Sequence, residues 1–239
     1  MSDQHLVLVC GKTASGKSSS LMSITHPEGV LHLNCENGHK LPFPSKFITK
    51  DIVDPLQVYE GFTYAETKDD IHTIVVDSAT FMMDMYESIH VLPSTTTMQA
   101  WGNYAQFFKV LMNQYVNAST KNVIITGHTM DVFNEADMVT ETLVKVKGSL
   151  MNRGIESFFN TIVGTKRVTL KKLEAYQSDL LNITEDDKDL GFKHVIQTRL
   201  TKDTVNERIR SPIGMWDRNE TFIDGNLQLV LDRLHKYYD

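Results

Sequence analysis

Short apolar runs alternate with segments of helical periodicity along the first half of the chain. Each run is rich in Val, Ile and Leu and ends in a polar or charged residue, the pattern of a buried parallel strand whose carboxyl end reaches a sheet edge. We interpret four such runs as strands, at residues 5–10, 30–35, 71–77 and 122–127. Helical spacing predicts helices at residues 17–24, 55–68 and 79–91 and along the aromatic stripe from Trp101 to Tyr115. Strands that alternate with helices indicate βαβ units and a parallel sheet.

The second half of the chain has more closely spaced strands. We expect strands at residues 161–170 and 192–200, a short helix at 152–159 and a C-terminal helix at 226–238. Two polar stretches are expected to lack regular structure: a loop at residues 129–141 and an acidic surface turn within residues 174–191. The expected fold is α/β, with a mostly parallel central sheet flanked by helices and an antiparallel C-terminal extension. The length of 239 residues fits a single domain, residues 1–239.

Charge and composition narrow the class of protein. The formal net charge of −6 argues against a protein that coats nucleic acid through overall positive charge, although it is compatible with a local basic patch. Cys10 and Cys35 each lie near the end of a predicted strand, so we interpret them as buried thiols in a reducing compartment. There is no leader-like segment and no apolar run of membrane-spanning length, which predicts a soluble cytoplasmic protein with no membrane partner.

A glycine-rich segment between the first predicted strand and helix carries the strongest chemical signal. Residues 11–18 match the phosphate-binding loop (P-loop) pattern G-x-x-x-x-G-K-S/T without substitution. In this context backbone N–H groups surround a phosphate chain, Lys17 reaches the outer phosphates and the Ser18 hydroxyl ligates Mg²⁺. The expected cofactors are therefore Mg²⁺ and ATP, with GTP as an open alternative. We assign nucleotide binding to Gly11, Lys12, Thr13, Ala14, Ser15, Gly16, Lys17, Ser18 and Ser19.

Two carboxylates follow predicted strands and are expected to meet this loop at the carboxyl edge of the sheet. Asp77 has the position of a Walker B carboxylate, which together with Ser18 would hold Mg²⁺. The alternative is that Asp77 or Ser78 caps the following helix. Glu36 is the candidate to orient and deprotonate a water molecule near the γ-phosphate, and its alternative is a loop carboxylate.

Together, the P-loop, the segment Cys35-Glu36-Asn37 and the run ending at Asp77 resemble the RecA-like recombinase core. More narrowly, the chain resembles the phage RecA-like P-loop ATPases of single-strand annealing and recombination (AAA/RecA type). Trp101 before the fourth strand and the Lys147-Gly148 turn after it are supporting similarities. The resemblance implies that Glu36 is the catalytic base. It also implies an ATP hydrolase that binds single-stranded DNA in phage recombination, annealing or replication.

By the same resemblance, His128 lies where a polar sensor residue contacts the γ-phosphate and passes its presence to a DNA-binding loop. The alternative is a structural histidine at a strand end. Residues 129–147 correspond to the DNA-facing region, in which Lys145 and Lys147 are candidates for contacting DNA phosphates. Because this region also carries several acids, the alternative for these lysines is a solvated face.

RecA-like assemblies complete their nucleotide site with a cation from the neighbouring subunit. Residues 208–212 are similar to the segment that carries this cation, which makes Arg208 the expected trans-acting residue, with Lys202 and Arg210 as alternatives. The resemblance therefore implies a homo-oligomer, either a ring or a filament. The expected catalytic residues are Lys17, Glu36, His128 and Arg208.

Two other functions stay open on the sequence. The first is a nucleotide or small-molecule kinase built on the same loop, although no dense arginine cluster follows the third or fourth strand to form a lid. The second is a nucleotide-dependent assembly or loader protein in which slow hydrolysis times release. If the protein is phage-encoded, the expected compartment is the cytoplasm of the bacterial host.

Overall fold

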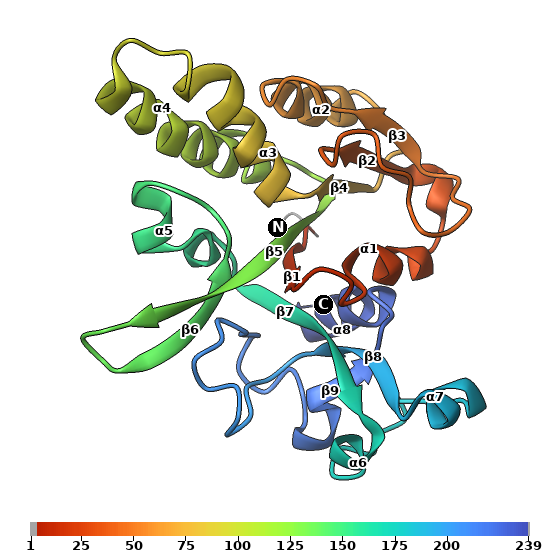
Figure 1. Ribbon diagram of the computed structural model, residues 1–239. Helices are drawn as coiled ribbons and strands as arrows, with labels where there is room; N and C mark the ends of the chain where they lie inside the picture. Colours follow the sequence, from red (N-terminus) through yellow and green to blue (C-terminus); the bar gives the residue numbers. More distant parts are fainter. Residues whose placement is uncertain (1–3, 239) are drawn as a thin grey trace.

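One nine-stranded sheet forms the centre of the molecule within residues 4–238, the part of the chain that the computed structural model describes. The strand order is β3-β2-β4-β5-β1-β7-β8-β9, and β6 pairs with β5 outside this row (Figure 1). The strands are β1 (Leu6–Gly11), β2 (Val30–Asn34), β3 (Ile48–Asp51), β4 (Thr73–Asp77), β5 (Asn122–Asn134), β6 (Val139–Val144), β7 (Thr161–Thr169), β8 (Phe192–Gln197) and β9 (Phe222–Asp224).

The pairing of the strands confirms the expected α/β fold. The six strands from β3 to β7 in this row are parallel to one another. Strand β8 is antiparallel to β7 and β9 is antiparallel to β8, which is the expected antiparallel C-terminal extension. Because these strands run in the same direction, the segments after β1, β2 and β4 converge at a single edge, and His128 of β5 lies level with Gly11 at the end of β1.

Helices cover both faces of the sheet (Figure 1). Helices α2, α3 and α4 lie on one face, and α1 and α8 lie on the other. The helices are α1 (Lys17–Ser20), α2 (Gln57–Glu66), α3 (Ala79–Tyr86), α4 (Thr97–Val110), α5 (Ser149–Arg153), α6 (Leu170–Leu173), α7 (Glu185–Leu190) and α8 (Gln228–Tyr238). A 3₁₀ turn, Leu21–Ser23, follows α1, and π-helical turns, Glu87–Val91 and Leu111–Val116, follow α3 and α4.

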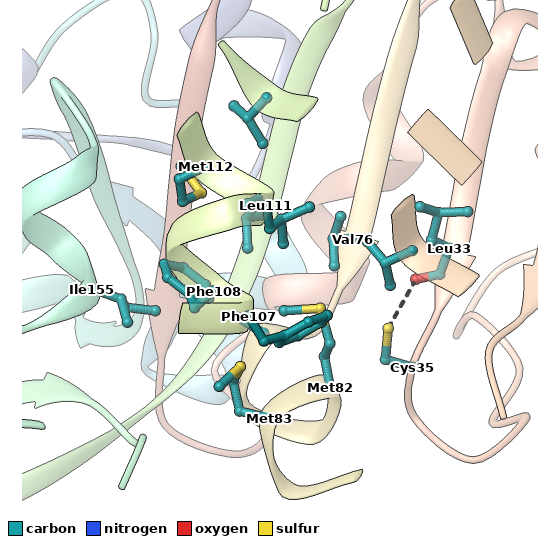
Figure 2. Packing of buried hydrophobic residues seen from close by; sticks show 14 of the residues in the cluster. Leu33, Cys35, Val76, Met82, Met83, Phe107, Phe108, Leu111, Met112 and Ile155 are labelled. Atoms are coloured by element: carbon teal, nitrogen blue, oxygen red, sulfur yellow. Dashed lines mark hydrogen bonds between the residues drawn. The ribbon is translucent and has the colours of Figure 1, made fainter. Parts of the chain in front are cut away.

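The larger core lies between the sheet and helices α2 to α4. Figure 2 shows Phe108, Leu111 and Met112 of the α4 segment packed with the α3 methionines over the sheet. Phe108 and Leu111 are both fully buried, so the predicted aromatic stripe belongs to the core. On β1, Leu8 belongs to this core whereas Val7 and Val9 belong to the core under α1 and α8, as the alternation of side chains along a strand requires.

The prediction of a loop at residues 129–141 is wrong. Strand β5 continues to Asn134 and pairs with β6 in an antiparallel hairpin, with Asp131 opposite Thr142. Much of this hairpin is exposed to solvent, and its sequence is therefore mostly polar. A polar composition of this kind is also typical of a loop, so composition alone did not reveal the strands. The hairpin, residues 129–144, extends the sheet beyond the edge at which the P-loop lies (Figure 1).

Other elements also differ from the sequence predictions. The edge strand β3 was not expected, because its four residues are largely exposed and show no apolar run. The acidic run at residues 185–189 is solvated as expected but forms helix α7 rather than a turn. A capping box stabilises its start: the Thr184 hydroxyl accepts from the Asp187 N–H, and the Asp187 carboxylate accepts from the Thr184 N–H at 2.9 Å.

Among the described residues, every helix is too short or too polar to cross a lipid bilayer.

Candidate functional site

The P-loop connects β1 to α1 at the carboxyl edge of the sheet. Gly16 adopts a φ of 101°, a left-handed conformation that glycine adopts without strain. The Lys17 side chain is buried, and its Nζ donates to the carbonyl oxygens of Gly11 and Lys12, both at 3.1 Å. Burial lowers the pKa of Lys17, while the nearby carboxylates of Glu36 and Asp77 act in the opposite direction. The ammonium group is thus held inside the curve of the loop.

Asp77, at the end of β4, is bound from several sides. Its Oδ2 accepts from the Ser18 hydroxyl at 3.1 Å, and its Oδ1 accepts from the Thr126 hydroxyl of β5. The Nε2 atom of His32, a buried residue of β2, lies 3.7 Å from Oδ2. Burial raises the pKa of the Asp77 carboxyl, but His32 and the hydroxyl donors outweigh burial and lower it overall. Asp77 is therefore ionised at neutral pH.

These groups fit a magnesium site of the P-loop kind. Mg²⁺ is usually bound through one or two protein oxygens together with substrate phosphates and water, rather than by a cage of protein ligands. Ser18 and Asp77 supply one hydroxyl and one carboxylate at hydrogen-bonding distance from each other. Ser78 adds a fully buried hydroxyl that has no hydrogen-bond partner among the described residues. Within residues 4–238 there is no cluster of three or more His, Cys, Asp or Glu residues that would hold a metal by itself.

Glu36 and His128 meet directly in front of Lys17. The Glu36 Oε1 atom lies 3.2 Å from Nε2 of His128, and the other ring nitrogen, Nδ1, lies 3.4 Å from Nζ of Lys17. An ammonium group can only donate, so Nδ1 accepts from Lys17 and Nε2 carries the proton that is donated to Glu36. The rings of Phe81 and His128 also pack edge to face, with 5.5 Å between their centroids, which holds the imidazole in place. Three residues predicted separately from the sequence thus form one line of polar contacts.

The P-loop also contacts the hairpin. Lys12 Nζ lies 2.6 Å from Oδ2 of Asp131 in β5, and Oδ1 of Asp131 accepts from the Thr142 hydroxyl of β6 at 2.7 Å. Hydrogen bonds from Lys12 and Thr142 lower the pKa of the Asp131 carboxyl. Thr13 lies 3.5 Å from His128 Nδ1. The first half of the P-loop therefore contacts both His128 and the strands of the hairpin.

Arg208 is held within its own chain. Its guanidinium pairs with Glu141 of β6 at 3.2 Å and with the buried Glu156 at 3.5 Å. Of the two alternatives to Arg208, Arg210 donates to the backbone carbonyl of Glu156, whereas Lys202 is exposed. The structure thus brings Lys17, Glu36, Asp77 and His128 together and places Arg208 at the base of the hairpin, in contact with other groups.

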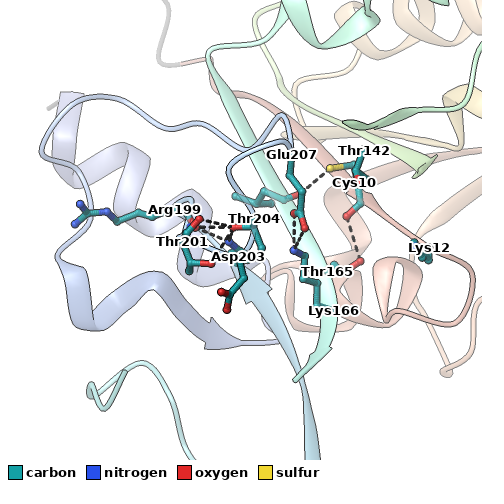
Figure 3. Close-up of polar contacts among 12 residues, drawn as sticks. Cys10, Lys12, Thr142, Thr165, Lys166, Arg199, Thr201, Asp203, Thr204 and Glu207 are labelled. Atoms are coloured by element: carbon teal, nitrogen blue, oxygen red, sulfur yellow. Dashed lines mark hydrogen bonds and ion pairs between the residues drawn. The ribbon is translucent and has the colours of Figure 1, made fainter. Parts of the chain in front are cut away.

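A cavity of about 280 Å³ lies between the first half of the P-loop and Arg208. Figure 3 shows part of its wall, in which Lys166 of β7 pairs with Glu207 and the Cys10 backbone accepts from Thr165. Burial raises the pKa of the Cys10 thiol to about 12, so this cysteine is a packing residue rather than a nucleophile. Lys166 pairs with Glu207 and Arg208 pairs with Glu156, so each of these wall cations lies beside a carboxylate.

The two lysines predicted to contact DNA have different environments. Lys145 is exposed, whereas Lys147 pairs with Glu87 and lies 4.0 Å from Asp84. The hydrogen bond to Glu87 raises the pKa of Lys147. Gly148 has a φ of 60°, and a Cβ atom there would lie 3.1 Å from the Trp101 ring. Trp101 and the Lys147-Gly148 turn, which are distant in sequence, are therefore neighbours.

Three residues of the site were missed by sequence reasoning. Thr126 and His32 contact Asp77, and Asp131 contacts Lys12. Thr126 lies within a strand that was predicted from the sequence, but its contact with Asp77 depends on the pairing of β4 with β5. His32 and Asp131 carry no signal for their contacts, since one is inside an apolar run and the other is in the region expected to be a loop.

Comparison with known proteins adds the family. A family model described as an AAA domain matches residues 4–177, which is more than half of the chain. The chain belongs to the AAA domain family. The matched region of this AAA domain includes the P-loop, Glu36, Asp77, His128 and the hairpin, and it ends before Arg208. AAA proteins are nucleotide-dependent ATPases that use ATP and Mg²⁺. No curated protein matches the sequence closely enough to count as a relative.

Proposed function

We propose that this AAA protein is a Mg²⁺-dependent ATP hydrolase that binds single-stranded DNA and acts as a homo-oligomer in DNA recombination, annealing or replication. The observation that carries the hydrolase function is the line of contacts from Glu36 through His128 to Lys17. A site built only to bind a triphosphate needs the P-loop but has no need of a carboxylate oriented in front of its lysine. The resemblance to phage RecA-like ATPases supports the DNA function and a phage origin.

The geometry supports the following roles. Lys17 and the P-loop backbone bind the phosphates, and Ser18 with Asp77 holds Mg²⁺, which neutralises phosphate charge when bound. Glu36 orients a water molecule and accepts its proton, while the Nε2 proton of His128 fixes the direction of the carboxylate. His128 contacts Lys17 as well as Glu36, so a phosphate drawn to Lys17 also changes the environment of the base. This is the physical content of the proposed sensor role.

The hairpin is the proposed surface for single-stranded DNA. It exposes Phe133 and Met138 to 55% and 73%, and Lys145 follows its second strand. Exposed aromatic rings bind unpaired bases by stacking without sequence preference, and a nearby lysine contributes a phosphate contact. The acids of the hairpin are partly neutralised, because Asp131 pairs with Lys12 and Glu141 pairs with Arg208.

We also propose that Arg208 contacts the nucleotide of a neighbouring subunit, which requires a change in its present contacts. In its own chain the guanidinium pairs with Glu141 and Glu156, so contact with a neighbour's nucleotide requires exchange of at least one of these partners. Arg208 has a side-chain exposure of 29%, which leaves part of the guanidinium accessible. An arginine supplied in this way stabilises charge on the transferred phosphoryl group.

ATP turnover with and without single-stranded DNA tests the hydrolase. Lys17→Ala is expected to abolish both rates, because it removes the cation inside the loop. Undiminished hydrolysis by this variant would exclude the assigned site. Transfer of phosphate to a nucleoside monophosphate instead of water would indicate a kinase, and binding without turnover would indicate a loader protein.

DNA binding is tested separately, by titrating fluorescent single-stranded DNA at several salt concentrations. Phe133→Ala is expected to weaken binding roughly five-fold or more, as loss of one stacked base predicts. Ile213→Ala is the matched control, because Ile213 is 95% exposed and lies far along the chain from the hairpin. Equal binding by both variants and the parent protein would exclude Phe133 from the DNA surface.

A further inference from the structure

A second pocket lies against the other half of the P-loop. It has a volume of about 390 Å³, within the range of roughly 300–1,000 Å³ that is typical of small-molecule sites. Strand β8 and the residue after β9 form its far side. The residues that define its shape are Ala14, Ser15, Gly16, Ser19, His194 and Gly225.

The position of this pocket in the sheet is opposite to that of the hydrolytic groups. Glu36, Asp77 and His128 lie on or directly after β2, β4 and β5, on one side of β1. The pocket is lined from β7 and β8, on the other side of β1. A triphosphate whose outer end reaches Lys17 and Glu36 must therefore extend across the loop toward Ser19. The part of the nucleotide beyond the phosphates is directed to this pocket.

His194 is fixed on the surface of the loop. Its Nδ1 atom lies 3.1 Å from the carbonyl oxygen of Ser15, and because a carbonyl only accepts, Nδ1 carries the proton. A Cβ atom on Gly16 would lie 3.3 Å from the same nitrogen, so the ring packs directly against the glycine. Among the described residues, Nε2 of His194 has no hydrogen-bond partner, and the side chain is exposed to the pocket.

We infer that this pocket is the nucleoside subsite of the protein and that His194 contacts the base. The inference rests on the proposed nucleotide function and adds to it the residue that recognises the nucleoside. The small side chains of Ala14, Gly16 and Ser19 leave room for a flat ring, and the imidazole offers a flat surface against which a base stacks. The pocket binds the nucleoside, and the loop binds the phosphates.

The test compares two ligands that differ only in the nucleoside. Isothermal titration calorimetry of the 239-residue protein with Mg²⁺ measures the affinities of ATP and of inorganic tripolyphosphate. His194→Ala is expected to weaken ATP binding about ten-fold, as loss of one stacking partner predicts, and to change tripolyphosphate binding less than about two-fold. His26→Ala, at an exposed imidazole before the amino end of β2, is the matched control and is expected to change neither affinity.

A second variant fills the pocket instead of removing a wall. Ser19 is exposed, so Ser19→Trp is compatible with the fold and places an indole where the nucleoside would lie. It is expected to weaken ATP binding more than tripolyphosphate binding. Equal loss of both ligands in His194→Ala, or no loss of ATP affinity in either variant, would overturn the inference. The variant Lys17→Ala distinguishes failure of this inference from failure of the proposed nucleotide function. If Lys17→Ala binds both ligands with parental affinity, the proposed nucleotide function itself has failed.

Discussion

Nε2 of His128 donates to Oε1 of Glu36 across 3.2 Å, which links β5 to the segment after β2, a strand that is not its neighbour in the sheet. Strand β4 separates β2, which precedes Glu36, from β5, which carries His128. The imidazole of His128 therefore reaches past β4 to contact the carboxylate. The orientation of the Glu36 carboxylate therefore depends on one imidazole side chain.

Replacement of His128 tests this dependence. His128→Ala is expected to lower kcat for ATP by roughly 10- to 100-fold, because Glu36 loses the donor that directs it, and to retain ATP binding through the P-loop. Single-turnover hydrolysis combined with calorimetric ATP binding separates the two effects. An unchanged kcat would show that the Glu36–His128 contact has no part in hydrolysis.

Asp77→Asn is expected to alter the dependence on Mg²⁺. The amide keeps the size of the side chain but removes the negative charge beside the Ser18 hydroxyl. The concentration of Mg²⁺ that gives half-maximal turnover should rise by about ten-fold or more, in keeping with loss of a charged ligand. A titration of ATP turnover against Mg²⁺ measures this shift, and a curve identical to that of the parent protein would exclude Asp77 as a ligand.

Gly154→Ala is expected to destabilise the protein. Gly154 has a φ of 73°, and an added Cβ would collide with the Arg208 guanidinium and lie 2.7 Å from Oε2 of Glu156. Backbone strain and the broken ion pair together predict a loss of roughly 1–3 kcal/mol in the free energy of unfolding, measured by urea denaturation.

Gly102→Ala is the matched control for Gly154. Gly102 lies within α4, and a Cβ atom there meets no atom within 4 Å. Because alanine is the better helix former, this variant is expected to gain up to about 1 kcal/mol. Destabilisation of equal size in both variants would contradict the proposed clash at Gly154.

Glu66 predicts a pH dependence of stability. Its carboxylate accepts from the Ser119 hydroxyl at 2.6 Å and from the Thr120 N–H and hydroxyl, and these bonds outweigh burial and lower its pKa below 4.5. A lowered folded-state pKa means that the stabilisation is fully present above the unfolded pKa and is lost as the pH falls through the folded value.

The variant Glu66→Gln removes this titration. We expect the free energy of unfolding at pH 7 to fall by roughly 1 kcal/mol, a value kept small because the side chain is exposed, and the loss of stability below pH 4.5 to become shallower. Urea denaturation at a series of pH values measures both effects. Parallel pH profiles for the two proteins would contradict the assigned role of Glu66.

The strand ends could be predicted from sequence because two local signals coincide there. A β-branched apolar run fixes the strand, and a polar residue at or just after its end marks the sheet edge, which located Glu36 and Asp77. His128 was expected at a strand end in the same way, but β5 continues past it to Asn134. The hairpin could not be predicted in this way, since its pairing joins Asp131 to Thr142 in a solvated ribbon without an apolar run. The contacts of His32 with Asp77 depend on the order of β2 and β4 in the sheet, which periodicity does not encode.

In the ion pair between Lys12 and Asp131, the Lys12 ammonium group has two competing partners, the Asp131 carboxylate and a bound phosphate. Lys12 belongs to the P-loop, where phosphate is the natural partner of a cation, and at 2.6 Å it is also bound to the hairpin. Any phosphate that draws Lys12 away releases Asp131 from that pair, and any ligand that moves Asp131 makes Lys12 available to phosphate. By thermodynamic linkage these two effects are equal in free energy, so nucleotide and hairpin ligand must change each other's affinity by the same factor.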